Sequence, residues 1–548
     1  MLLLASFFDS LPVTLGMRSE AGAWNPDAVV NRLQLVLALG GIALLGWHLW
    51  LSHGGQQARF RKTRDVALAV LGLLGAWAYP NFGRAHFTNF IHAWDVYHYY
   101  VGAKYFPELG YEWLYDCTAV ADYDAGLTRL TLARHHTDLR TNVVVPSSLA
   151  VENGDVCRAR FTPERWREFV SDVTFFRNRT GYAKWVWVQK DHGYNASPVW
   201  TLAGHALADT GPATPLSVTL LCWVDPLLLL LAAASLWWAF GWRTAAVAAL
   251  VFGVNIPARY TWTGGAFLRH DWFFALALSV ALLKKSRPAL AGAAVAYATL
   301  LRLFPGLLLA GPFLLLLARR RRAGTWDREL LRFGLGGIVA TVLLVGASLG
   351  LPGGVDNWVT FARNTQKHAA TPLTNHMGLR TVLSYRPSTI GAALADGKQA
   401  DPWAAWKQAR LDGFAAARPV FYALLLLALW LLYRAVAPEG TEAWLAAALG
   451  TGFICFGAEL TSYYYCFLSV FAVAVAKRRE VALLLLVACV AWCFIDWAPF
   501  GWMSTWEDEK KVAMSVVALL VVALGWFGFT RAGARWALLP EPGGGRLG

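Results

Sequence analysis

The segment HAWDVYHYY, residues 92–100, places an aspartate between two histidines directly after an apolar run. Three kinds of chemistry fit these residue types. His92, Asp95 and His98 would bind a metal, although on a helix the two histidines lie about 9 Å apart along the axis and point in different directions. Asp95 would alternatively cap a helix at a membrane surface. In the third interpretation Asp95 is a general base, which accepts the proton of a hydroxyl as its oxygen attacks an activated sugar carbon.

Other ionisable residues lie within or beside apolar runs, where a charge is costly and usually marks a functional site. We expect most of them on the same side of a membrane as Asp95, so that a few carboxylates face a group of cations. A basic cavity beside lipid suits a lipid-linked phosphate, because arginine offers paired donors to phosphate oxygens. Arg269 would otherwise pair with Asp271 or extend to the interface. Asp225, before Pro226, is interpreted as a helix-start cap. The remaining candidates are Arg259, His270, Arg302, His376, Arg380 and Glu459.

The composition predicts the scaffold that must position these residues. The chain has 548 residues, of which 57% are hydrophobic and 15% charged, whereas a soluble protein carries about a quarter charged residues. The apolar residues come in blocks near the roughly 20 residues that cross a bilayer as a helix. We therefore expect an all-α integral membrane protein, a bundle of about 12–13 transmembrane helices with a large extracytoplasmic loop.

The basic segments between the apolar runs predict the topology. The net charge is +14, and because much of it lies in short connectors, the positive-inside rule explains it without a nucleic-acid partner. The stretch 289–318 is interrupted by Arg302 and Pro305, which predicts a hairpin of two short helices. The segments expected to face the cytoplasm are 59–64, 284–287, 319–322 and 477–479. The expected spans are approximately 33–51, 66–80, 216–239, 244–256, 265–283, 289–302, 305–318, 331–351, 419–437, 443–458, 462–476, 481–497 and 512–530.

The spans divide the chain into five regions. These are the N-terminal spans 1–80, an extracytoplasmic loop 81–215 with Asp95 and an interfacial helix, a transmembrane core 216–351 with the hairpin, a second extracytoplasmic loop 352–418, and C-terminal helices 419–548.

The first loop is long enough to fold. Within it, Cys117 and Cys157 form a disulfide or are two unrelated thiols. TNVVVPSS (141–148) and YAKWVWVQ (182–189) have strand character. At the N-terminus, MLLLASFF lacks the basic start and the cleavage site of a signal peptide.

Three segments carry a resemblance to a known family: WDVYHYYVGAKYFPELGYEWLYD (94–116), GGAFLRHDWFFALALSVALLKKSRPALAGAAVAYATLLRLFPGLLL (264–309) and NHMGLRTVLSY (375–385). Together they resemble the GT-C superfamily of membrane glycosyltransferases. More specifically, they are similar to glycosyltransferase family 87 (DUF2029), the polyprenol-phosphate-mannose-dependent mannosyltransferases. The blocks are an aspartate before an aromatic interfacial helix, a small-residue stretch leading to a basic hairpin, and an asparagine-containing outer-loop motif.

The resemblance implies an inverting transferase on the non-cytoplasmic face. It would move a mannose-like hexose or a pentose from a polyprenyl-phosphate donor to a lipid-linked or surface glycan acceptor. Asp95 matches the family's base, and Lys104, Arg302 and Arg380 match contacts to the phosphate or the lipid carrier. The other expected substrate-binding residues are His98, Tyr99, Arg259, Arg269, His270, Asp271, Asn375 and His376.

The expected partners are therefore the donor, the acceptor and membrane lipids, with no nucleic acid. No cofactor is expected, and a divalent metal stays an alternative that is not favoured. The expected location is a plasma membrane or a bacterial inner membrane, crossed many times, with the active site facing the periplasm or the exterior.

Two other functions compete with the enzyme. A transporter or flippase for lipid-linked sugars also needs a basic outer cavity, but transporters commonly have two halves with interrupted helices in corresponding positions. Here the interrupted hairpin 289–318 has no evident twin, which favours the enzyme. A membrane protein with a binding ectodomain at 81–215 would fold and bind its partner through that loop alone.

Overall fold

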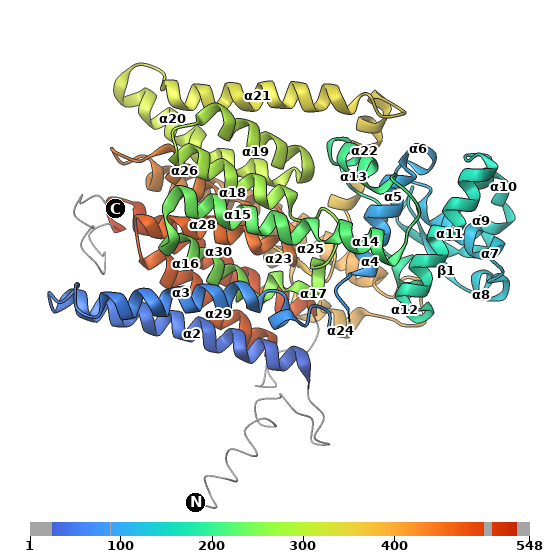
Figure 1. Cartoon of the computed structure of the whole chain (residues 1–548), viewed down its shortest axis with the longest axis horizontal. Coiled ribbons are helices and arrows are strands. Elements are labelled where there is room, and N and C mark those ends of the chain that lie inside the picture. Colours follow the sequence, from blue (N-terminus) through green and yellow to red (C-terminus); the bar gives the residue numbers. More distant parts are fainter. Residues whose placement is uncertain (1–24, 88, 498–506, 534–548) are drawn as a thin grey trace, which may run out of the picture.

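The computed structural model describes residues 25–87, 89–497 and 507–533. The segment MLLLASFF and the C-terminal EPGGGRLG lie outside the described residues. The described chain forms a long bundle of helices with a helical lobe at one end (Figure 1). Its strands form two antiparallel pairs, β1 (His135–Asp138) with β2 (Val143–Pro146) and β3 (His376–Met377) with β4 (Leu460–Thr461).

The outer helices of the bundle have the length and composition of membrane spans. They also expose apolar side chains, since Leu230, Leu343 and Leu426 are 68%, 67% and 67% exposed. Contiguous apolar surface of this kind is typical of a membrane interface. An all-α membrane protein is therefore confirmed, whereas the number of 12–13 spans stays a prediction. Among the described residues, six stretches qualify as spans: α2 (Pro26–His53), α14–α15 (Pro215–Phe240), α21 (Arg328–Ser348), α25 (Ala404–Val436), α29 (Glu480–Trp497) and α30 (Glu507–Phe529).

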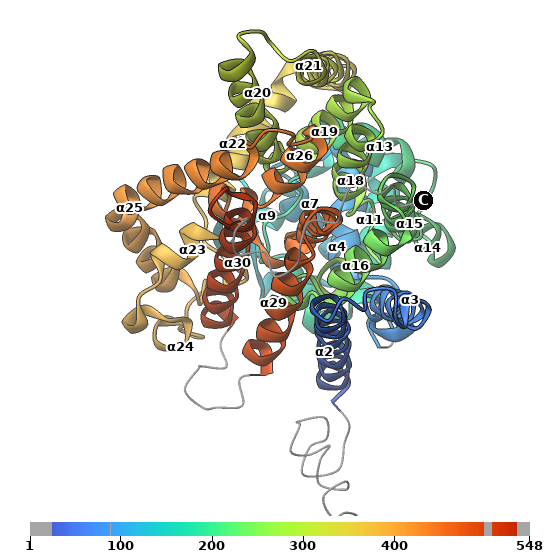
Figure 2. The same ribbon diagram turned by 90° about the vertical axis from the view of Figure 1, so that its left-hand side faces the viewer.

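Shorter helices fill the middle of the bundle. All residues of α26 (Ala443–Thr451) and most of α18 (Asp271–Lys284) are buried. Seen along the bundle, they lie inside a ring that includes α2, α21, α25 and α30 (Figure 2). The other helices of the bundle are α3 (Arg61–Ala78), α14 (Pro215–Cys222), α15 (Val224–Phe240), α16 (Trp242–Gly253), α17 (Tyr260–Thr263), α19 (Pro288–Arg302), α20 (Ala310–Ala323), α27 (Ile454–Gly457) and α28 (Leu468–Phe471), with 3₁₀ turns η1 (Asn81–Gly83), η3 (Ile256–Ala258), η4 (Phe304–Leu309), η6 (Ser462–Phe467) and η7 (Ala472–Ala476).

The predicted hairpin at 289–318 is confirmed. Helix α19 ends at Arg302, and the chain turns through η4, which contains Pro305, before α20 begins. The two outer ends of the hairpin lie together, because Lys284 pairs with Glu442 at 3.3 Å while Arg319 donates to the neighbouring Thr441 carbonyl at 2.8 Å.

The four basic segments gather at one end of the bundle. Arg64 and Arg479 both contact the His48 ring, and Lys477 pairs with Glu442, the same carboxylate that Lys284 contacts. This grouping is what the predicted topology requires. That this end faces the cytoplasm stays a prediction.

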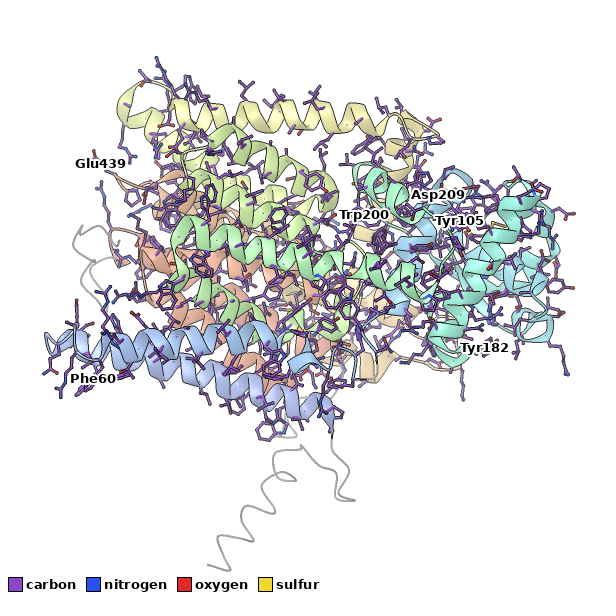
Figure 3. All side chains as sticks on the ribbon, viewed as in Figure 1. Phe60, Tyr105, Tyr182, Trp200, Asp209 and Glu439 are labelled. Carbon is purple, nitrogen blue, oxygen red and sulfur yellow. A yellow bond between two sulfur atoms is a disulfide. The ribbon has the colours of Figure 1, made fainter. Side chains whose placement is uncertain are left out.

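The lobe, residues 81–215, corresponds to the predicted outer loop and is called the ectodomain below, while its side of the membrane stays a prediction. Figure 3 shows that Tyr105 and Asp209 of the ectodomain lie at the opposite end from Phe60 and Glu439. Its other elements are α4 (Ala93–Val96), η2 (Tyr97–Val101), α5 (Gly102–Lys104), α6 (Phe106–Leu109), α7 (Leu114–Asp124), α8 (Thr128–Leu132), α9 (Ser147–Glu152), α10 (Gly154–Arg158), α11 (Pro163–Thr180), α12 (Tyr182–Val188) and α13 (Pro198–Ala208).

The ectodomain decides three sequence predictions. A disulfide joins Cys117 and Cys157, as one of the two interpretations expected. TNVVVPSS does contain a strand, β2. The strand predicted for YAKWVWVQ is wrong: this segment is α12, because Trp185 and Val188, three residues apart, are both fully buried on one helical face.

The second predicted loop, 352–418, ends earlier than expected. Its elements are α22 (Val355–Ala369), β3, α23 (Leu379–Ser384), η5 (Pro387–Thr389) and α24 (Gly391–Leu394). Helix α25 then starts at Ala404 and continues through Pro419, where a boundary was predicted. Residues 404–418 are rich in alanine and arginine, both good helix formers, so the helix extends beyond the apolar segment.

Candidate functional site

Asp95 lies in a single helical turn, α4, that continues into the π-helical turn η2. The ring Nδ1 of His92 accepts the backbone N–H of Asp95 at 3.1 Å, so His92 is the helix cap. The interpretation of Asp95 as a cap is therefore wrong. Its carboxylate is available for other contacts.

A glycine brings the Asp95 segment to the turn before α18. The Gly265 carbonyl accepts the backbone N–H of His92 at 3.0 Å. Gly265 has a φ of 66°, and a Cβ at this position would lie 1.8 Å from the Phe90 carbonyl oxygen. Only glycine permits both the backbone conformation and this close approach.

The contact places Asp95 against Arg269. The Nε of Arg269 lies 3.0 Å from Oδ2 of Asp95, and both side chains are buried. The atoms are close without the alignment of a hydrogen bond. Burial raises the pKa of Asp95 to about 6, although the positive charges of Arg269 and Arg302 act in the opposite direction. A carboxyl group that titrates near neutral pH is suited to accept a proton in catalysis.

Tyr99 brings a second arginine to the site. The guanidinium carbons of Arg269 and Arg302 lie 4.3 and 5.2 Å from the centre of the Tyr99 ring. Arg269 also donates through Nη2 to the Tyr463 hydroxyl at 3.3 Å. Aromatic faces of this kind stabilise guanidinium groups that are out of water.

Several of these guanidinium nitrogens have no partner. Nε and Nη2 of Arg302 and Nη1 of Arg269 are buried and make no hydrogen bond among the described residues. Buried donors are normally paired, and an unpaired one is costly. Two guanidiniums with free donors form a site for an anion with several oxygens, such as a phosphate.

The backbone beside both arginines is strained. Leu268, before Arg269, has a φ of 48°, and Leu303, after Arg302, has a φ of 57°. Side-chain-bearing residues rarely adopt such angles, which concentrate at binding and catalytic sites. The surrounding structure thus holds both arginines in place at a cost.

Asp225 provides part of that support. Its Oδ1 accepts the backbone N–H groups of Arg269 at 2.7 Å and His270 at 3.2 Å, and its Oδ2 lies 2.9 Å from Nδ1 of His270. It makes no capping bond to its own helix. The interpretation of Asp225 as a helix cap is therefore wrong, because the buried side chain holds the Arg269 turn instead.

The remaining polar residues nearby have other partners. Nε2 of His98 lies 2.7 Å from the Tyr115 hydroxyl, and Oδ1 of Asp271 accepts the Trp272 backbone N–H at the start of α18. Across the part of the chain that the structure describes, no three His, Cys, Asp or Glu side chains are grouped to hold a metal.

Two of the predicted binding residues lie elsewhere. Lys104 is fully buried in the ectodomain, where its ammonium group lies 2.6 Å from Glu168 and 2.8 Å from Asp172. Arg259 pairs with Asp496 of α29 at 2.7 Å. Both cations have carboxylate partners of their own, so the structure places them outside the cluster around Asp95.

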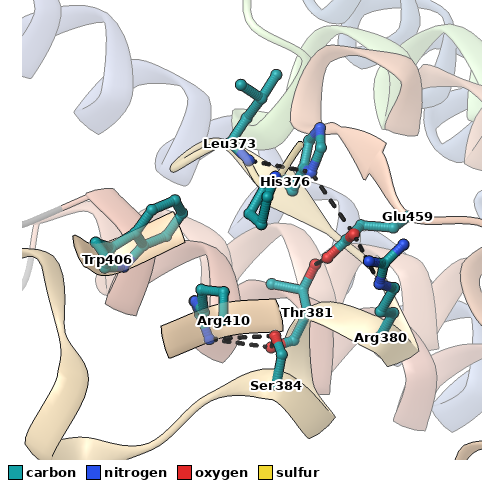
Figure 4. A pocket seen from close by; sticks show the side chains of 9 residues that line it. Leu373, His376, Arg380, Thr381, Ser384, Trp406, Arg410 and Glu459 are labelled. Carbon is teal, nitrogen blue, oxygen red and sulfur yellow. Dashed lines mark hydrogen bonds and ion pairs between the residues drawn. The ribbon is translucent and has the colours of Figure 1, made fainter. Parts of the chain in front are cut away.

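The motif NHMGLRTVLSY forms a second cluster (Figure 4). Glu459 at its centre lies 3.3 Å from Nε of Arg380 and 3.8 Å from Nδ1 of His376, and it accepts the Thr381 hydroxyl at 2.9 Å. Arg380, which was predicted to contact the phosphate or the lipid carrier, therefore has a carboxylate partner in this second cluster.

Asn375 connects this second cluster to the first one. The backbone carbonyl of Asn375 accepts the backbone N–H of Ser462 at 2.9 Å, and Ser462 directly precedes Tyr463. The segment that carries Glu459 thus continues directly into the segment that carries the tyrosine bound by Arg269.

Two site residues were not predicted. Tyr463 lies in the sequence TSYYY, where an aromatic triplet follows a glutamate within apolar runs. Asn195 accepts the Tyr99 hydroxyl at 2.6 Å, and no pattern around it distinguishes it from a loop asparagine.

No family model, no curated protein and no solved structure matches the chain.

Proposed function

We propose that the chain is an inverting membrane glycosyltransferase of the GT-C type that uses a polyprenyl-phosphate sugar. The observation that carries this proposal is a pair of arginines whose unpaired donor atoms are buried beside a carboxyl group of raised pKa. Arg269 and Arg302 bind the phosphate of the donor, and Asp95 is the base. Arg380 and Lys104, which have carboxylate partners, have no role in phosphate binding.

The reaction follows from this arrangement. Asp95 accepts the proton of the acceptor hydroxyl while its oxygen bonds to the anomeric carbon of the sugar. The bond from that carbon to the phosphate oxygen breaks, and the polyprenyl phosphate leaves with the bonding electrons. Arg269 and Arg302 stabilise the negative charge that develops on the leaving oxygen. Attack opposite the leaving group inverts the anomeric carbon.

The ion pair between Asp95 and Arg269 is the arrangement of the protein when no donor is bound. A bound phosphate competes with Asp95 for the Arg269 guanidinium. Once this contact weakens, the positive charge that lowers the pKa of Asp95 is partly neutralised, and the carboxylate becomes a stronger base. Donor binding therefore prepares the base.

The position of the site supports its placement on the outer side of the membrane, which we propose the chain crosses 12–13 times. Asp95 is in α4 of the ectodomain and contacts Arg269 of the bundle, and α4 lies away from the end where the basic segments gather (Figure 1). The disulfide between Cys117 and Cys157 is of the kind that persists in oxidising compartments. Basic connectors stay preferentially in the cytoplasm. A bacterial inner membrane with a periplasmic site meets both conditions.

The test is sugar transfer from a polyprenyl-phosphate mannose donor by the purified protein. A general base contributes about 10²–10⁴-fold to rate, so Asp95→Asn should lose transfer by that factor while it still binds the donor. Arg380→Gln, in the second cluster, is the matched control and should keep transfer. Equal rates for the wild type and Asp95→Asn would refute the role of the base, and lipid movement without transfer would identify a flippase.

A further inference from the structure

A cavity of about 790 Å³ lies at the basic end of the bundle. It is formed by α2, α3, α16 and the junction of η7 with α29, and it includes none of the residues around Asp95. Its apolar wall comes from helices of the membrane bundle and includes Leu44, Leu45, Leu68, Val247 and Leu486.

The rim of this cavity is strongly basic. Six lysines and arginines line it, against two carboxylates, Asp65 and Glu480. Asp65 is already bound by Arg243 through two bonds of 2.8 and 2.7 Å. The other cations are Arg61, Arg64, Lys477, Arg478 and Arg479, of which Lys477 pairs with Glu442 at 2.6 Å.

Two of these arginines meet at a single histidine. Nη1 of Arg64 contacts Nδ1 of His48, and Nη1 of Arg479 contacts Nε2 of the same ring. A neutral imidazole has one accepting nitrogen and one N–H, so it accepts from only one of the two arginines. Arg64 is only 8% exposed, and its Nε has no hydrogen-bond partner. Nη2 of Arg64 already donates to the Gln57 carbonyl, whereas Nε of Arg64 and one of the two guanidiniums at His48 lack an acceptor.

We propose that this cavity binds an anionic phospholipid of the inner leaflet. The headgroup phosphate accepts from Nε of Arg64 and from the guanidinium that His48 leaves without an acceptor, and the acyl chains lie along the apolar wall. A free phosphate would satisfy the arginines but would leave that wall without a partner. Basic pockets between membrane helices are suited to such headgroups. This site differs from the donor site, which lies at the other end of the bundle.

The experiment titrates the purified full chain in neutral detergent with dioctanoyl phosphatidylglycerol, dioctanoyl phosphatidylcholine or inorganic phosphate. Binding is read by native mass spectrometry and by thermal stability. Phosphatidylglycerol should bind and raise the melting temperature, because a ligand of the folded state stabilises it. Phosphatidylcholine and phosphate should bind much more weakly. Equal binding of phosphate and phosphatidylglycerol would overturn the lipid as the ligand.

Substitutions of the cavity residues test whether phosphatidylglycerol binds at this site. Arg64→Gln with Arg479→Gln should weaken phosphatidylglycerol binding about fivefold per arginine. Arg287→Gln, an exposed cation of the same end outside the cavity lining, is the control and should bind like the wild type. Loss of the same size in this control would indicate a nonspecific charge effect and overturn the site.

Two further variants cover the case in which the buried pair disturbs folding. Arg61→Gln with Arg478→Gln removes rim cations and should also weaken phosphatidylglycerol binding. Leu68→Trp narrows the apolar part and should reduce lipid binding while the weak phosphate binding stays unchanged. Wild-type lipid affinity in both of these variants would refute the cavity as the binding site.

Discussion

Arg302→Met separates donor binding from structural stability. In the wild type, Nε and Nη2 of Arg302 are buried and without a hydrogen-bond partner. These two nitrogens form the paired edge that binds a phosphate in two parallel bonds. A hydrogen bond to a charged group contributes about 1.5–3 kcal/mol. Loss of both is therefore expected to weaken donor binding by about 3 kcal/mol, or roughly a hundredfold.

The same substitution should not destabilise the protein without donor. Methionine keeps much of the length of the side chain and adds no donor that needs a partner. Because unpaired buried donors cost about 1–3 kcal/mol, the free energy of unfolding is expected to stay equal or to rise. Arg302→Lys, which offers a point charge without the planar edge, should recover only part of the affinity.

The assay measures binding of a phosphonate analogue of a polyprenyl-phosphate sugar and, separately, thermal unfolding without ligand. Arg380→Met is the control, because Arg380 pairs with Glu459 at 3.3 Å. Its loss leaves Glu459 without its arginine partner, so stability should fall while donor affinity stays the same. If Arg302→Met instead behaved like Arg380→Met, with lower stability and unchanged affinity, Arg302 would be a structural arginine and the reasoning would be refuted.

Three further predictions concern the support and the titration of the site. Because the pKa of Asp95 is raised to about 6 and the base must be deprotonated, kcat/KM should rise with pH through about 6 and then level off; a profile that is flat from about pH 5 to 7.5 would contradict this role. Asp225→Asn keeps the size of the side chain but weakens its hold on the Arg269 backbone, so transfer should fall about tenfold at unchanged expression, as measured by initial rates. Reduction of the bond between Cys117 and Cys157 should lower the stability of the ectodomain by about 2–4 kcal/mol, and a melting curve unaffected by reductant would argue against this contribution.

Local patterns in the sequence are sufficient to predict most of the membrane helices. Apolar runs of spanning length predicted α2, α21, α29 and α30, because a helix satisfies its backbone internally wherever lipid surrounds it. The proline in LRLFPG predicted the break after Arg302 for an equally local reason. The strand predicted for YAKWVWVQ is wrong because its residue types favour a strand, while packing against the ectodomain core requires a helix.

Pairing across the chain depended on the tertiary structure. Asp95 and Arg269 are 174 positions apart, and they meet because a glycine lets two backbone segments approach closely. Lys104 and Arg380 look equally suited to phosphate in the sequence, yet folding gives each of them a carboxylate partner. The sequence by itself therefore determined the membrane helices and the charged residues available for chemistry. Which cations keep free donors was decided only by the packing of distant segments, because a charge is neutralised by whichever group the fold places beside it.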